Sequence, residues 1–226
     1  MTDNISTNIS TDNKDPRVSQ YILEFPLDND FVQVMKELDG MRKVGNCLVV
    51  GCLEEPTAIV LSDVVEVVGV DLRGYNRGDE YRGPEPCPYK HIVGDVREVE
   101  LPHNHFDLAV SISVIEHIGL GYYKDFDEAD GDTSAMMAIH RALKVGGKCI
   151  ITVPIGGEFM AKNATGHWRL YCPKTISRLT AGFKVLKQRY FFTSYLGNGD
   201  AALADVSKNK TADISCLLVM EKVGGK

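Results

Sequence analysis

Seven short apolar runs, separated by turn and helix signals, constrain the fold of this chain more than any other feature. The earlier runs are rich in Val, Ile and Leu without alternation, which is typical of parallel strands covered on both faces. The last two are longer and more alternating, which favours an antiparallel pair at a sheet edge. We therefore predict an α/β domain with a seven-stranded, mostly parallel, doubly wound sheet. The runs occupy residues 47–50, 65–70, 91–93, 106–112, 148–153, 184–192 and 214–221.

The N-terminal part divides into a tail and a helical region. Residues 1–16 contain a tandem N-I-S-T repeat and too little apolar surface to offset the entropy of ordering, so we predict a disordered tail. Within residues 17–44, Asp28 or Asp30 is expected to cap a helix, which we interpret as a lid that precedes the sheet. Residues 45–226 then form one domain.

Helix signals also lie between the later apolar runs. Asp132 or Thr133 is expected to begin a helix, which Gly146 and Gly147 end directly before the strand KCIITVP. Another helix is expected to start near Pro173. This alternation of strands and helices supports the doubly wound arrangement.

Composition disfavours several classes of protein. No run of about 18 apolar residues occurs and no secretory leader is visible, so we expect no membrane span and interpret the chain as cytoplasmic. Residues 1–140 carry 11 Lys or Arg against 26 Asp or Glu, whereas residues 141–226 carry 14 against 5. This split argues against a nucleic-acid partner. The basic part would suit a substrate phosphate or carboxylate, or would simply form a solvated face. The six cysteines form no C-x-x-C pair, so we expect reduced thiols.

Glycine and acidic residues directly follow the first three predicted strands. Gly51 follows the first, Asp71 follows the second twenty positions later, and Asp95 follows the third. Ligands of doubly wound sheets bind beyond the carboxyl ends of the strands. Asp71 is placed to accept both hydroxyls of an adenosine ribose, and Asp95 to accept from an adenine amino group.

Taken in order, these segments resemble the class I S-adenosylmethionine-dependent methyltransferases over about residues 45–222. The markers are FDLAVSISVIEHIG, the later LKVGG before a strand, and GHWRLYCPKTISRLTAGFKV. EHIGLGYY, DGD and NATGHWRLY are similar to a sparsely characterised branch catalogued as a domain of unknown function, with members associated with surface-glycan synthesis. The resemblance implies a Rossmann-like methyltransferase fold and S-adenosylmethionine as cofactor. The cofactor-binding residues that it implies are Gly51, Asp71, Leu72, Asp95, Val96 and Ser111.

The loop after the first strand departs from the pattern of that superfamily. Val49 stands where an acidic residue is usual, and Leu53 and Glu55 stand where the second and third glycines are usual. Only Gly51 is kept. Because a non-glycine residue at positive φ costs about 1–2 kcal/mol, we expect this loop to follow a different path.

Methyl transfer to a hydroxyl needs a base that takes the proton of the acceptor. His117 is the first candidate and His167 the second. The segments at residues 122–123 and 168–171 are expected to converge over the methyl donor. They would offer stacking surfaces and a guanidinium fork to the acceptor. Their predicted substrate-binding residues are Tyr122, Tyr123, Trp168, Arg169 and Tyr171. We predict no metal site, because His103 and His105 lack a second ligand pair at fixed spacing.

The leading hypothesis is a methyltransferase that uses S-adenosylmethionine to modify a small-molecule or sugar acceptor at oxygen. One alternative is a binding or scaffold protein of the same fold that has lost catalysis, which the altered glycine loop favours. A nicotinamide-dependent oxidoreductase is a further alternative, but G-x-G-x-x-G is missing. The acceptor and the oligomeric state stay open.

Overall fold

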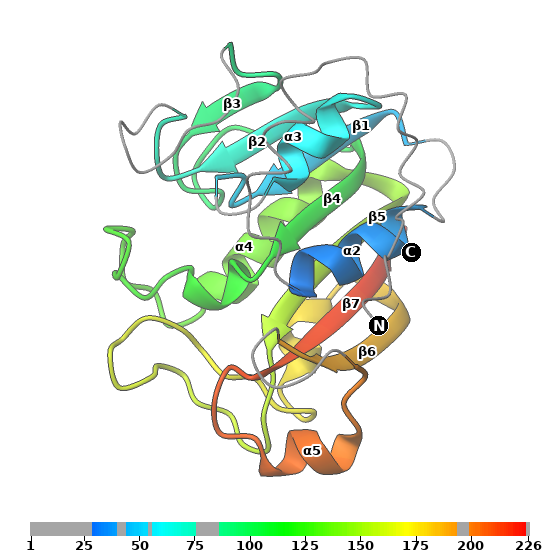
Figure 1. Cartoon of the computed structure of the whole chain (residues 1–226). Helices are drawn as coiled ribbons and strands as arrows, with labels where there is room; N and C mark the ends of the chain where they lie inside the picture. Colours follow the sequence, from blue (N-terminus) through cyan, green and yellow to red (C-terminus); the bar gives the residue numbers. More distant parts are fainter. Residues whose placement is uncertain (1–28, 40–43, 54–55, 76–85, 194–198, 225–226) are drawn as a thin grey trace.

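The computed structural model describes residues 29–39, 44–53, 56–75, 86–193 and 199–224. Seven strands form one sheet in the order β3-β2-β1-β4-β5-β7-β6 (Figure 1). Strands β1 to β5 run parallel, and β7 runs antiparallel to both of its neighbours, β5 and β6. This sheet confirms the predicted fold class and its C-terminal antiparallel pair. The strands are β1 (Asn46–Val50), β2 (Glu66–Asp71), β3 (Lys90–Val93), β4 (Phe106–Ile112), β5 (Leu143–Pro154), β6 (Phe183–Phe192) and β7 (Ile214–Lys222).

Helices cover both faces of the sheet. The short helices α3 and α5 were not expected from the sequence, whereas α2, α4 and η3 correspond to predicted helices. Both α3 and α5 are six residues long, too short for a clear helical periodicity. The helices are α2 (Asn29–Asp39), α3 (Thr57–Ser62), α4 (Gly131–Ala142) and α5 (Leu203–Lys208), with the 3₁₀-helices η2 (Ile115–His117) and η3 (Ile176–Thr180).

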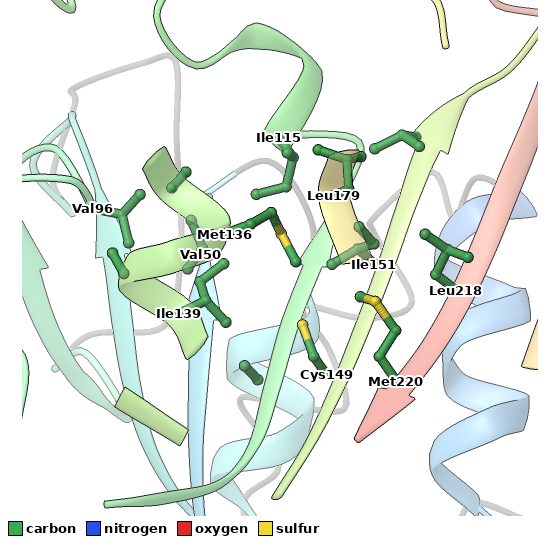
Figure 2. Packing of buried hydrophobic residues seen from close by; sticks show 14 of the residues in the cluster. Val50, Val96, Ile115, Met136, Ile139, Cys149, Ile151, Leu179, Leu218 and Met220 are labelled. Carbon is green, nitrogen blue, oxygen red and sulfur yellow. The ribbon is translucent and has the colours of Figure 1, made fainter. Parts of the chain in front are cut away.

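One face of the sheet packs against α4 and η3. Leu48 and Val50 of β1 point to this face and share a buried cluster with Met136 and Ile139 of α4. Figure 2 shows these helix side chains filling the space between α4 and the strands. Leu179 of η3 belongs to the same cluster and is fully buried. Burial of these apolar side chains stabilises the packing of α4 and η3 against the sheet.

The opposite face packs against α2 and α3. Val49 of β1 points to this face, because successive residues of a strand alternate between its two sides. Phe31 and Val34 of α2 and Ile59 of α3 belong to this second buried cluster. The described part of the predicted lid helix thus forms a layer over the sheet, and Figure 1 shows α2 beside β5 and β7.

The helix α4 ends four residues before Gly146, the first of the two glycines that we expected to end it. It ends at Ala142, and β5 begins at Leu143, which pairs with Phe106 of β4 and is fully buried. The register between β4 and β5 then shifts, and pairing resumes at Leu108 and Lys148. Gly146 lies at φ +79° in the irregular segment between these pairs. The glycines therefore allow a bulge within β5 and do not cap the helix.

Other expectations have a mixed outcome. The tail predicted at residues 1–16 lies outside the described residues. All six cysteines are free thiols, as expected. Among the helices described, none is long and apolar enough to cross a membrane.

Candidate functional site

A pocket of about 280 Å³ lies beyond the carboxyl ends of β1, β2, β3 and β4. Strand β1 connects to β2 on one side and borders β4 on the other, so the pocket lies where the strand order reverses. This is the position at which doubly wound sheets bind ligands. The residues that line it are Val50, Gly51, Val70, Asp71, Leu72, Arg73, Gly94, Asp95, Val96, Ile112, Ser113, Val114, His117, Ile118, Tyr123 and Asp125.

Gly51 forms the floor of the pocket where β1 ends. Its φ of +76° is a backbone conformation that favours glycine. A Cβ at this position would lie 2.2 Å from the side chain of Val114, so there is no room for another residue. The backbone of Gly51 is therefore exposed to the pocket without an intervening side chain.

The loop after β1 directs a backbone amide at Asp71. The N–H of Leu53 donates to Asp71 Oδ2 at 3.2 Å, and the Leu53 side chain is buried. The neighbouring thiol of Cys52 lies 3.4 Å from His91 Nδ1, and burial raises the pKa of this thiol to about 12. Leu53, which stands where the superfamily pattern usually has its second glycine, thus packs its side chain into the protein interior. Glu55, which also departs from the superfamily pattern, lies outside the described residues.

Asp71 is buried at the end of β2, and its carboxylate binds Arg73. The Arg73 guanidinium donates through Nε to Oδ1 at 2.7 Å and through Nη2 to Oδ2 at 3.0 Å. The backbone N–H of Arg73 also donates to Oδ1 at 3.0 Å. The predicted ribose acceptor therefore lies in the pocket, with an arginine across it that the sequence prediction missed.

Asp95 has the same arrangement at the end of β3. Arg97 lies two residues later and donates to Asp95 Oδ1 through its backbone N–H and through Nε, each at 2.9 Å. The side chain of Arg97 is only 3% exposed, because it also donates to Glu128 at 2.8 Å and packs 3.7 Å from the ring centre of Phe126. The signal was visible in the sequence as DLR and DVR, one after each strand.

His117 and Tyr123 form the side of the pocket that faces β4 and the following loop. His117 Nδ1 lies 2.6 Å from the backbone carbonyl of His167. Because a carbonyl only accepts, Nδ1 carries the hydrogen, and the neutral ring has its lone pair on Nε2. The hydroxyl of Tyr123 lies 2.6 Å from His167 Nε2. The structure thus brings both predicted bases together, although only His117 lines the pocket.

Tyr122 extends this cluster outward. Its ring stacks on the His167 imidazole with 4.1 Å between ring centres, and half of the residue is exposed. The His117 and His167 rings lie 4.7 Å apart. Trp168 is half-buried and is not a lining residue. Tyr122, Tyr123, His117 and His167 are called the imidazole–phenol cluster below.

Arg169 and Tyr171 lie inside the protein and are not among the residues that line the pocket. Arg169 is 1% exposed and donates to the carbonyls of Ile118 at 2.6 Å and Ala129 at 3.2 Å. The hydroxyl of Tyr171 donates to Asp132 at 2.8 Å, and burial together with that carboxylate keeps its pKa well above the usual value. The geometry therefore gives these two residues a structural position, in contrast to the substrate contacts that we predicted.

The basic C-terminal part of the chain binds the acidic segment of residues 125–132, which is called the acidic insertion below. Arg178 donates to Asp130 and Asp132, each at 2.9 Å, and Arg169 Nε lies 3.8 Å from Asp132. The uneven charge of the sequence is thus partly neutralised within the fold. Among the described residues, no group of three or more His, Cys, Asp or Glu side chains is arranged to hold a metal ion.

Ser113, and not the predicted Ser111, lines the pocket. Ser113 lies at φ 50°, and its hydroxyl donates to Asp30 of α2 at 2.8 Å. Ser111 is buried within β4, where its hydroxyl has no hydrogen-bond partner among the described residues. Glu116 is also buried, and burial together with the charge of Asp30 raises its pKa well above the usual value. Asp30, in the first turn of α2, thus lies directly behind Ser113, which lines the pocket.

Comparison with solved structures gives the class of the fold. The 1,6-didemethyltoxoflavin-N1-methyltransferase of Burkholderia thailandensis, solved with S-adenosylhomocysteine, is 16% identical, with a TM-score of 0.57 over 87% of this chain and 77% of that one. A putative methyltransferase of Bacillus halodurans is 14% identical, with a TM-score of 0.59 over 85% and 99% of the two chains. The [4+2]-cyclase SpnF is 17% identical, with a TM-score of 0.59 over 87% and 81%. The chain therefore has the Rossmann-like methyltransferase fold.

Its family follows from the sequence. Residues 89–219, more than half of the chain, match the family described as Caenorhabditis protein of unknown function, DUF268. The chain belongs to this family. No curated protein sequence matches the chain. Because a fold can support several reactions, as the cyclase shows, the reaction has to be argued from the pocket.

Proposed function

We propose that the chain is an S-adenosylmethionine-dependent methyltransferase that modifies a small-molecule or sugar acceptor, at a hydroxyl oxygen. One observation carries the proposal. Gly51, Asp71 and Asp95, from the ends of three adjacent strands, line one pocket together with His117 and Tyr123. A nucleoside site and a candidate base thus share one cavity in a methyltransferase fold.

The lining residues fit the cofactor. Gly51 lines the pocket and has no side chain, so its backbone faces the ligand directly. Asp71 and Asp95 supply carboxylates, which accept hydrogen bonds from ribose hydroxyls and from an adenine amino group. Val96 is buried and Leu72 is 38% exposed, and both offer apolar surface to the adenine ring. When bound, S-adenosylmethionine supplies a sulfonium methyl group that an acceptor oxygen attacks in line.

The imidazole–phenol cluster is the proposed acceptor side of the pocket. His117 Nε2 takes the proton from the acceptor hydroxyl, because Nδ1 already donates to the His167 carbonyl. Tyr122 and Tyr123 supply ring faces on which a sugar or another small-molecule acceptor packs.

Two alternatives make different predictions. An inactive scaffold of the same fold would bind an acceptor or partner without turnover, and the loop with Leu53 favours it. A nicotinamide-dependent oxidoreductase would bind NAD at the same acidic residue. The absence of G-x-G-x-x-G in the sequence argues against NAD.

Isothermal titration with S-adenosylhomocysteine and with NAD separates these readings. We expect saturable binding of S-adenosylhomocysteine at one site per chain, no saturation with NAD, and affinity at least about tenfold weaker for Asp71→Ala. Binding of NAD without S-adenosylhomocysteine would overturn the cofactor assignment. Binding of neither, in a folded sample, would favour the scaffold.

A further inference from the structure

The pocket is too small to hold the cofactor and a whole acceptor together. Its volume is about 280 Å³. A single drug-sized ligand usually fills about 300–1,000 Å³, and a nucleoside cofactor with an amino-acid tail is a ligand of that size. An acceptor that reaches His117 therefore keeps most of its surface outside the pocket, against the residues around its opening.

Exposed aromatic rings gather beside this part of the pocket. Tyr122, Tyr123 and Phe126 fall within five residues of one loop, and all three are exposed. Tyr123 lines the pocket, whereas its neighbour Tyr122 is not a lining residue. Single exposed apolar side chains are ordinary, but a group of them next to a pocket indicates a surface that binds a ligand.

The ring of Tyr122 is held in place although 51% of the residue is exposed. It stacks on the His167 imidazole with 4.1 Å between ring centres and 27° between ring planes. His167 is fixed in turn, because its backbone N–H donates to Asn163 Oδ1 at 2.6 Å and its carbonyl accepts from His117 at 2.6 Å. A ring that is already positioned loses little conformational entropy when a ligand packs on it.

A row of rings connects the proposed base with this exposed position. The His117 ring lies 4.7 Å from the His167 ring, on which Tyr122 stacks. Tyr122 is thus two ring contacts away from His117. An acceptor ring whose hydroxyl binds His117 Nε2 lies on the pocket side of this row, so the exposed ring of Tyr122 is left for a second ring of the same acceptor.

The imidazole–phenol cluster suits a polyhydroxy ring. Its side chains offer ring faces and hydrogen-bonding edges without a fixed charge. Arg169, which we expected to offer a guanidinium fork to the acceptor, is buried and donates to backbone carbonyls. A sugar ring has an apolar C–H face and hydroxyl groups around its edge, so it matches this surface better than an anionic acceptor does.

We propose that the acceptor is the end of an oligosaccharide chain, with its terminal ring at His117 and Tyr123 and its next ring stacked on Tyr122. Tyr122 is thereby a specificity-determining residue that selects a chain over a single sugar. This inference rests on the proposed function, because it extends the acceptor side of the same pocket.

The test offers sugars of different length in one mixture. The purified protein is incubated with methyl-labelled S-adenosylmethionine and a partial acid hydrolysate of total cellular polysaccharide, which contains single sugars and chains of increasing length. Labelled products are separated by size, and the label in chains is divided by the label in single sugars, each relative to the amount present. Because both products form in the same reaction, this ratio does not depend on how much of a variant is active.

Three variants accompany the wild type. Tyr122→Ala removes the ring, and Tyr122→Phe keeps the ring without its hydroxyl. Leu203→Ala is the matched control, because it truncates an exposed apolar side chain on α5. We expect a ratio of about three to ten for the wild type, Tyr122→Phe and Leu203→Ala, and a ratio of about one for Tyr122→Ala.

A wild-type ratio of about one would overturn the inference and leave the proposed function standing, whether or not the variants fold. A ratio that Tyr122→Ala leaves unchanged, or that Tyr122→Phe lowers equally, would also overturn it. Label that appears in a small-molecule extract but in no sugar of the hydrolysate would do the same. No enzyme-dependent label in either mixture would overturn the inference and the proposed function together.

Discussion

The side chain of Val114 occupies the space that a side chain at Gly51 would need, at the point where β1 and β4 end side by side. A Cβ at Gly51 would lie 2.2 Å from Val114 Cγ2. The two strands pair directly, with Val49 opposite Val110, so the turns that follow them lie close together. One glycine therefore sets both the shape of the pocket floor and the packing of its wall.

Gly51→Ala should be strongly destabilising. Positive φ and the overlap with Val114 together predict a loss of about 2–4 kcal/mol in the free energy of unfolding, and loss of S-adenosylhomocysteine binding. Gly74→Ala is the matched control, because a Cβ added at Gly74 would have no neighbouring atom within 4 Å among the described residues. Urea unfolding and titration calorimetry measure the two effects. Equal stability of both variants would contradict the described turn.

Arg169→Ala should act on stability. The guanidinium is buried, and without it the carbonyls of Ile118 and Ala129 lose a donor and Asp132 loses a charge partner. We expect a loss of about 3–5 kcal/mol in the free energy of unfolding, compared with under about 0.5 kcal/mol for the exposed Arg141→Ala. Wild-type stability of Arg169→Ala with impaired turnover would restore the predicted role in substrate binding.

Glu116 should make stability depend on pH. Burial raises its pKa in the folded protein well above the usual 4.5, so the folded state keeps a proton that the unfolded chain releases. The stabilisation from this group is therefore complete below the unfolded pKa and is lost as pH rises toward the folded pKa. Glu116→Gln removes this loss.

Urea midpoints between about pH 5 and pH 8 measure the effect of that substitution. The difference between Glu116→Gln and the wild type should move in favour of the variant as pH rises, by up to about 1.4 kcal/mol per pH unit. A difference that does not change with pH would show that Glu116 titrates alike in both states.

His117→Asn should separate catalysis from cofactor binding. The base takes part in proton transfer, whereas Asp71 and Gly51 line the nucleoside part of the pocket. Turnover should fall about 10²- to 10⁴-fold, while S-adenosylhomocysteine affinity changes by less than about threefold. Tyr123→Phe, which removes only the hydroxyl bound to His167, is the conservative comparison. Parallel loss of affinity and turnover in His117→Asn would contradict its role as base.

The sheet was predictable because its signals are local. Runs such as Phe106–Ile112 are apolar, short and bounded by turns, and the structure has that strand with the same bounds. The residues after the strands were predictable too, since parallel strands end at one edge, and Gly51, Asp71 and Asp95 line the pocket. Helix α3 gave no comparable signal, because six residues are too few to show a period.

Side-chain burial was not predictable in the same way. Arg169 looked available because charged residues are usually exposed, yet the carbonyls that bind it belong to Ile118, directly after η2, and to Ala129 in the acidic insertion, far away in the sequence. The choice of Ser113 over Ser111 depends on a positive φ that only the folded turn defines. Arg73 and Arg97 follow their strands with the same D-x-R spacing, but only the structure shows that the Arg97 side chain is 3% exposed and the Arg73 side chain 20%.

Methyl transfer itself is the most direct test of the proposed enzyme. The purified chain is incubated with methyl-labelled S-adenosylmethionine and a small-molecule extract, and labelled products are separated and identified by mass spectrometry. We predict an enzyme-dependent labelled product, with a hydroxyl oxygen as the methylated atom, that is lost in Gly51→Ala and strongly reduced in His117→Asn. Saturable binding of the cofactor with no labelled product above that of His117→Asn would contradict the account and identify the chain as a binding protein.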